Sequence, residues 1–199
     1  MSNPTFEQVF GSLLRDKGTL ESLASAQVGG IELDKADSWL TVRLQFDHFV
    51  EFGAVAAAEE AVAAGLSLRT AEFLPVYPAD SLTEACFPTV VEFLRRRSAA
   101  VNGTFNDAEY RLEGDHLTIV LHHGGSNVLK ATKTDSLLEQ LLREMFGRRI
   151  TLTLDGETEI DTKSDAYQAM VKEGEAQAAK AAAEAVAHAA AAAPPPMPG

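Results

Sequence analysis

The sequence is poor in cysteine, in aromatic residues and in positive charge. Its 199 residues include one cysteine, Cys86, and one tryptophan, Trp39, and aromatic residues make up only 7% of the chain. A single cysteine excludes an internal disulfide framework and a cysteine-based zinc site, so a reducing cytoplasm is the expected location. The 17 Lys and Arg residues are outnumbered by 29 Asp and Glu, for a net charge of -12. This balance disfavours non-specific binding to nucleic acid or to an anionic membrane.

Targeting segments and long hydrophobic runs are also lacking. The first ten residues have neither a basic n-region nor an apolar h-region, so no signal peptide is predicted. The longest apolar stretch, near the C-terminus, consists mostly of weakly apolar alanine and is interrupted by Lys180, Glu184 and His188, so we do not expect it to span a membrane. Residues 156–199 are predicted to be an acidic, Ala/Pro-rich linker, helical or disordered, at which a fragment of a longer protein ends.

Two prolines divide the rest of the chain. Pro75 and Pro78 precede Ser81 and favour a short connection between a first domain, residues 1–78, and a second, residues 79–155. The first segment has a net charge of -6 and the second of -2. Hydrophobic periodicity in the first segment predicts the order helix, strand, strand, helix, strand near residues 5–14, 28–33, 39–46, 49–64 and 68–76.

The second segment repeats that order with one more helix. The tract Ser81-Leu-Thr-Glu84 resembles a capping box that starts a helix. Helix, strand, strand, helix, helix and strand are then expected near 81–99, 110–112, 117–121, 127–131, 135–146 and 150–154. This is the order of a type II KH domain. The predicted fold class is therefore α+β, with two small KH-like domains whose helices cover one face of a three-stranded sheet.

No set of residues points to catalysis. Glu59 and Glu60 are interpreted as a solvated helix face, and Cys86 as a small buried hydrophobic residue. His122 and His123 are neighbours on an extended chain, so their side chains point to opposite faces and do not suit one metal ion. We expect no catalytic, cofactor-binding or metal-binding residue, which argues against a small stand-alone enzyme.

Basic side chains gather in the second segment and allow two interpretations. They are candidates for contact with nucleic acid or an acidic partner, or they are ordinary charges near helix C-termini, where cations are favoured. Residues 130–134 occupy the place of the loop that clamps nucleic acid in KH domains, but they lack its GxxG pattern. The candidates are Arg95, Arg96, Arg97, Lys130, Lys133, Arg148 and Arg149.

Trp39 is the candidate anchor for a protein partner. It starts a strand whose alternate residues Leu40, Val42 and Leu44 form the predicted core face. Trp39 therefore lies on the opposite, mixed face, where it is either exposed as an anchor or covered by a helix.

Several tracts resemble the N-terminal region of PolC, the polymerase III alpha subunit of low-GC Gram-positive bacteria. Cys86-Phe-Pro-Thr-Val-Val-Glu-Phe-Leu94 resembles the aromatic-Pro-x-aliphatic helix that opens the second N-terminal domain of that family. Residues 38–46 and Ala71-Glu-Phe-Leu74 look like parts of the first N-terminal domain. The resemblance spans about residues 4–155 and is completed by the tracts His116–Leu121, Leu137–Gly147 and Ile150–Leu154.

The resemblance implies a non-catalytic module of a replicative polymerase. In that family an OB-fold, a proofreading exonuclease inserted in a PHP domain and the polymerase core follow these two domains, and the parent protein would be a DNA-directed DNA polymerase with 3'-5' exonuclease. The first domain is similar to a tau-subunit domain, which implies contact with the tau subunit of the clamp loader. The alternative is a KH-like module that binds single-stranded template or an RNA primer. Neither alternative involves a membrane.

Overall fold

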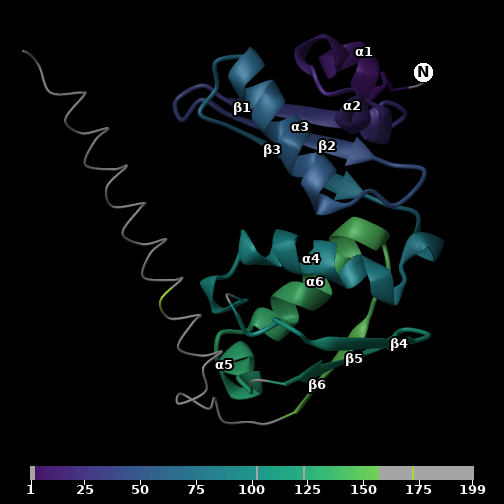
Figure 1. Ribbon diagram of the computed structural model, residues 1–199, viewed down its shortest axis with the longest axis vertical. Helices are drawn as coiled ribbons and strands as arrows, with labels where there is room; N and C mark the ends of the chain where they lie inside the picture. Colours follow the sequence, from purple (N-terminus) through teal and green to yellow (C-terminus); the bar gives the residue numbers. More distant parts are fainter. Residues whose placement is uncertain (1–2, 102, 123, 157–171, 173–199) are drawn as a thin grey trace, which may run out of the picture.

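The chain folds as an α+β protein with two three-stranded sheets (Figure 1). The computed structural model describes residues 3–101, 103–122, 124–156 and 172. We call the part built on the first sheet, residues 3–76, the N-terminal unit, and the part built on the second sheet, residues 79–156, the C-terminal unit. In both sheets the first two strands are antiparallel and the last two are parallel, as the predicted element order requires.

The N-terminal unit begins with short helices and continues into its sheet. Thr5 caps the first helix in a capping box with Gln8, and Asp16 caps the next through the backbone N–H of Thr19. The long helix crosses between the two parallel strands, which a tight turn cannot join. The elements are α1 (Phe6–Phe10), η1 (Gly11–Leu13), α2 (Lys17–Leu23), β1 (Gln27–Asp34), β2 (Trp39–Gln45), α3 (Phe52–Gly65) and β3 (Thr70–Val76).

The C-terminal unit has the predicted helix–strand–strand–helix–helix–strand order. Gly114, with φ of +58°, and Asp115 form the two-residue turn of the β4–β5 hairpin. Lys133, with φ of +55°, separates the last two helices. The elements are η2 (Ala79–Ser81), η3 (Glu84–Cys86), α4 (Phe87–Arg95), η4 (Ala99–Val101), β4 (Glu109–Glu113), β5 (His116–Leu121), α5 (Ser126–Ala131), α6 (Thr134–Phe146) and β6 (Thr151–Gly156).

The start of the first helix in this unit differs from the prediction. Helix α4 begins at Phe87, so the capping box proposed for Ser81 and Glu84 is wrong. Ser81 instead donates its hydroxyl to the carbonyl of Pro78 at 2.7 Å, and Glu84 accepts the backbone N–H of Leu112 at 2.9 Å. Pro88 lies in the first turn of α4, where its missing N–H has no intrahelical partner to lose.

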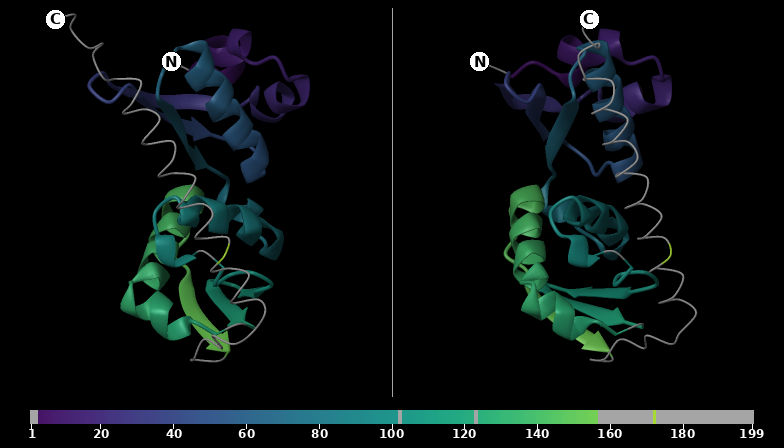
Figure 2. Two further views of the ribbon diagram at one scale, coloured as in Figure 1. Left: turned by 60° about the vertical axis from the view of Figure 1, so that its left-hand side comes forward. Right: turned by 90° about the vertical axis from the view of Figure 1, so that its left-hand side faces the viewer.

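Helices α4 and α6 lie between the two sheets, as Figures 1 and 2 show. Buried side chains of both units form one continuous hydrophobic core. Tyr77, at the connection, donates its N–H to the carbonyl of Met145 at 2.6 Å and its hydroxyl to the carbonyl of Val50 at 2.9 Å. Its ring contacts those of Phe46, Phe49 and Phe146. Tyr77 therefore contacts both units, through Val50, Phe46 and Phe49 on one side and Met145 and Phe146 on the other, and holds them together.

Two expectations concern the membrane and the tail. In the part of the chain that the structure describes, no helix combines the length and apolar character needed to cross a membrane. The predicted linker, residues 156–199, lies outside the described residues apart from Gly156 and Lys172.

Candidate functional site

Trp39 lies on the open face of the first sheet. Leu40, Val42 and Leu44 are buried, as the alternation predicts, whereas Trp39 is 39% exposed. Its antiparallel partner is Asp34, and the next pair on the same face is Glu32 with Thr41. These residues line one side of a shallow, open hollow at the end of the hairpin. A large aromatic side chain among carboxylates is suited to anchor a protein partner that carries positive charge.

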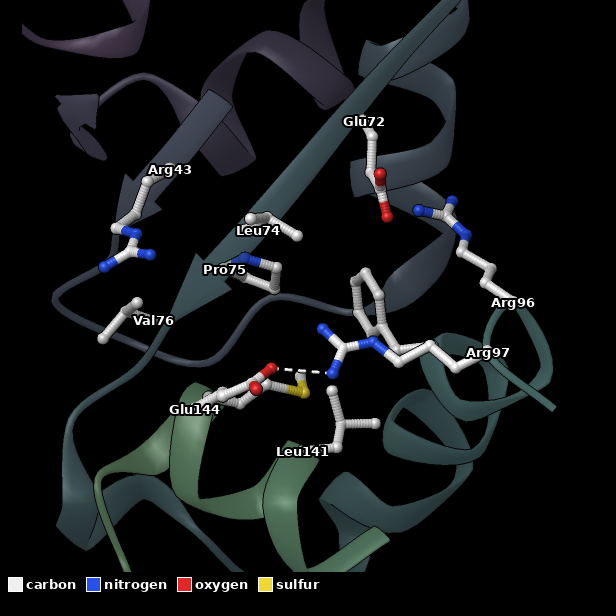
Figure 3. A pocket seen from close by; sticks show the side chains of 11 residues that line it. Arg43, Glu72, Leu74, Pro75, Val76, Arg96, Arg97, Leu141 and Glu144 are labelled. Carbon is white, nitrogen blue, oxygen red and sulfur yellow. Dashed lines mark hydrogen bonds and ion pairs between the residues drawn. The ribbon is translucent and has the colours of Figure 1, made fainter. Parts of the chain in front are cut away.

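A cavity of about 130 Å³ lies where the same sheet meets the C-terminal unit. Strands β2 and β3 contribute Arg43, Glu72 and Leu74, and helices α4 and α6 contribute Phe93 and Glu144 (Figure 3). Cationic and anionic groups thus surround an apolar floor. The cavity is part of the joint between the units, and the charges of Arg97 and Glu144 in its lining compensate each other.

Arg97 spans this cavity. Its guanidinium donates to the carboxylate of Glu144 at 2.7 Å (Figure 3). Partial burial raises the pKa of Glu144, but hydrogen bonds from Arg97 and Gln140 and the nearby charges of Arg97 and Arg43 outweigh it, so the pKa is lowered overall. The carboxylate is therefore held in its charged form as a partner for Arg97.

Arg96 makes a second contact between the units. Its guanidinium donates two hydrogen bonds to Glu59 of α3, at 2.9 and 2.5 Å, and lies over the rings of Phe52 and Phe93. Glu59 also accepts the backbone N–H of Phe73 at 2.7 Å. A planar guanidinium suits both the bidentate pairing and the stacking. Arg96 therefore joins α3, α4 and the outer edge of β3.

Glu59 corrects the sequence prediction of a solvated helix face. It is only 6% exposed, whereas Glu60 is exposed as predicted. The signal was present in the sequence, because Val55, Ala58 and Val62 place Glu59 on the same buried stripe at helical spacing. Its partner Arg96, 37 residues away, was not identifiable from the local pattern.

The structure divides the other basic candidates between the two ends of α6. Arg95 pairs with Glu92 at 2.7 Å near the end of α4, and Ser98 bonds Thr134 at 3.0 Å, which brings this region to the start of α6 beside Lys133. Arg148, after the other end of α6, pairs with Asp115 at 2.6 Å. Among the described residues no carboxylate pairs with Lys130, Lys133 or Arg149, and all three are exposed.

The remaining polar candidates have structural partners. Cys86 is buried and donates its thiol to the carbonyl of Ser81 at 3.3 Å. His122 lies 3.3 Å from a carboxylate oxygen of Glu109, and His116 bonds Thr153 at 3.1 Å. His123 lies outside the described residues. Within the described ranges, no cluster of His, Cys, Asp and Glu has the geometry to hold a metal ion.

Comparison with known families identifies the second half of the chain. The family model described as DNA polymerase III polC-type N-terminus II matches residues 85–198. The chain belongs to this family. The matched range begins beside the Cys86–Leu94 tract and contains α4 through β6 of the PolC-type region, so the predicted resemblance is confirmed there. The matched range also extends beyond residue 155, the predicted end of the second domain. Comparison with curated proteins gives no match.

Residues 1–84 precede the matched range. The likeness of residues 1–78 to the first PolC N-terminal domain therefore stays a prediction, although this unit repeats the strand pairing of the matched one. The matched range places the chain in the N-terminal region of a PolC-type polymerase III alpha subunit, a protein of DNA replication.

Proposed function

We propose that this chain is a non-catalytic N-terminal module of a PolC-type replicative polymerase that contacts the tau subunit of the clamp loader. The observation that carries the proposal is the exposure of Trp39 on the open face of the acidic N-terminal unit. Buried aromatic anchors supply much of the binding energy in protein interfaces, and tryptophan is enriched among them. A cytoplasmic location accords with this role.

The charge distribution supports protein contact over nucleic-acid contact. Arg95, Arg96, Arg97 and Arg148 each pair with a carboxylate of this chain. Binding of a nucleic-acid backbone depends on cations that are free to replace its counterions. Before they could contact nucleic acid, four of the seven basic candidates would have to break an ion pair with a carboxylate of this chain.

The test is the binding of the complete chain to purified tau subunit, measured by calorimetry. We expect Trp39→Ala to weaken binding at least tenfold, since the loss of an interface anchor typically costs more than about 1.4 kcal/mol. Thr151→Ala, an exposed position on the second sheet, is the matched control and leaves the affinity unchanged. Absence of binding to tau, or equal affinity of wild type and Trp39→Ala, would contradict the proposal.

A second candidate function is KH-like binding of single-stranded template or RNA primer. The helix–strand–strand–helix–helix–strand order of residues 87–156 supports kinship with type II KH domains, and the N-terminal unit would then be a truncated version. Lys130 and Lys133 are exposed beside the turn between α5 and α6, where a KH domain clamps the backbone. The missing GxxG pattern speaks against it.

The two candidates differ in their salt dependence. A labelled single strand is titrated with the chain at 50 and 200 mM salt. Affinity that falls steeply with salt and is lost in Lys130→Ser/Lys133→Ser supports the nucleic-acid alternative, because each released counterion adds to the slope. Binding that is absent at both concentrations leaves the tau contact as the better proposal.

A further inference from the structure

Glutamate side chains occupy three of the four sheet edges. Glu59 accepts the N–H of Phe73 on β3 at 2.7 Å, as described above. On β4, Glu84 accepts the N–H of Leu112 at 2.9 Å, and on β6 a carboxylate oxygen of Glu139 accepts the N–H of Leu152 at 3.1 Å. An outward N–H that already has an acceptor, beside a charged side chain, is a poor template for another strand. On each of these three edges, a charged side chain at an outward N–H therefore disfavours strand addition.

The outer edge of β1 is different. It is covered only at its start, where Thr5 bridges to Gln27 and Val28 donates its N–H to the carbonyl of Pro4 at 2.9 Å. From Gly29 to Asp34, no hydrogen bond to another described residue occupies the outer side of the strand. An edge strand turns the N–H and C=O of alternate residues outward, so this stretch carries free backbone donors and acceptors.

The side chains of this edge alternate in chemistry. Ile31 and Leu33 pair with Val42 and Leu40, so they extend the apolar core face, yet they are 50% and 49% exposed. Glu32 and Asp34 lie on the opposite face, beside Trp39. Among the described residues no cation pairs with either carboxylate. A strand added here would meet half-covered apolar side chains on one face and acidic side chains on the other.

We infer that the open β1 edge, residues 29–34, binds an extended segment of another protein in which apolar residues alternate with Lys or Arg. Such a segment would add a fourth strand, with its backbone pairing to β1, its apolar side chains covering Ile31 and Leu33, and its cations facing Glu32 and Asp34. The inference rests on the proposed protein-contact function and assigns that contact to one strand edge.

A second copy of this chain is the poorer occupant. Antiparallel pairing of two β1 edges centred on Leu33 would set Glu32 of each copy opposite Asp34 of the other. Like charges directly opposite one another destabilise a strand pair. Complementary charge therefore favours a basic partner over self-association.

The probe is a fluorescein-labelled peptide, Lys-Val-Lys-Val-Lys-Val-Lys, titrated into the complete chain and followed by anisotropy. A peptide of the same composition in blocks, Lys-Lys-Lys-Lys-Val-Val-Val, measures attraction by net charge alone. We expect the alternating peptide to bind at least tenfold more tightly than the block peptide. N-methylation of alternate residues, which removes backbone donors, should abolish that difference. Equal binding of all three peptides would overturn the inference.

A protein variant locates the contact. Leu33→Lys places a charge on the open edge at a half-exposed position, and we expect at least a tenfold loss of affinity for the alternating peptide. Thr151→Lys adds the same charge to the exposed face of the second sheet and leaves the affinity within twofold. Circular dichroism checks that both variants are folded. A loss of equal size in both variants contradicts a contact at this edge.

The same variants separate this inference from the proposed function. Tau binding that is unaffected by Leu33→Lys would overturn the edge contact while the tau contact stands. Selective peptide binding without tau binding would support the edge and reject tau as the partner. A wild-type dimer that Leu33→Lys dissociates would assign the edge to a second copy and overturn the basic-segment inference.

Discussion

The two units share one strand pairing and differ in what they expose. The four large hydrophobic side chains that are most exposed in the described structure, Ile31, Leu33, Trp39 and Leu66, all belong to the N-terminal unit. The open face of the C-terminal sheet carries polar side chains, among them Arg111 and Thr153. Because the same topology supports both surfaces, what each unit can bind depends on the side chains at its surface and on its strand edges.

The connections explain part of this difference. In the C-terminal unit two helices, α5 and α6, lie between the parallel strands in sequence, whereas the N-terminal unit has α3 alone. Of the C-terminal helices, α4 and α6 lie between the two sheets and face the N-terminal unit (Figure 2). In the N-terminal sheet, the outer edge of β1 from Gly29 to Asp34 accepts no hydrogen bond from another described residue and donates none.

The largest expected effect breaks the joint between the units. Tyr77→Ala removes a buried ring that contacts Phe46, Phe49 and Phe146. We expect a loss of about 3–5 kcal/mol in the free energy of unfolding, as for other large-to-small changes at aromatic core positions. Because the shared core couples the two units, loss of the Tyr77 ring from that core should let them unfold separately, and urea unfolding should show two transitions. Tyr77→Phe keeps the ring, loses only the hydrogen bond to Val50 and costs about 1 kcal/mol. A single transition of unchanged midpoint in Tyr77→Ala would refute the coupling.

A smaller effect concerns the ion pair across the same joint. Glu59→Ala leaves Arg96 without its carboxylate and removes the acceptor of the Phe73 N–H. We expect a cost of about 3 kcal/mol, at the low end for a broken buried pair because the Arg96 side chain is 29% exposed. Thermal unfolding measures it. The neighbouring variant Glu60→Ala is the control and should change stability by less than about 0.5 kcal/mol. Equal effects of both variants would contradict a buried, paired Glu59 and would support the solvated helix face that the sequence predicted.

What the sequence predicted well was set by local pattern. The alternation of Leu40, Val42 and Leu44 fixed β2 and the face of Trp39, and the short turn at Gly114 fixed the second hairpin. The start of α4 was misplaced because two short 3₁₀ turns precede Phe87, and the capping box found there joins Thr83 to Cys86 rather than Ser81 to Glu84. Local signals of this kind do not distinguish a turn from a helix start.

The ion pairs and the contacts between glutamates and edge strands could not be predicted, because each joins residues that are far apart in the sequence. Arg97 was a candidate for nucleic-acid contact by its place in a basic run, and its partner Glu144 lies 47 residues away. Glu84 and Glu139 gave no sequence sign that they occupy strand edges. Such contacts depend on tertiary packing, which a single sequence does not specify at the level of residue pairs.

The smallest expected effects compare the two crossover helices through one glycine each. Gly147 ends α6 with φ of +66°, where an L side chain is strained, and its N–H bonds the carbonyl of Arg143 at 2.9 Å. Gly53 lies in the first turn of α3 with nothing within 4 Å of an added Cβ. Gly147→Ala should therefore destabilise the chain by about 1 kcal/mol, whereas Gly53→Ala should stabilise it by about 0.5 kcal/mol through helix propensity and reduced chain entropy. Urea midpoints that move in opposite directions would bear this out. Movement in the same direction would mean that one of these glycines has a role in packing that its surroundings do not reveal.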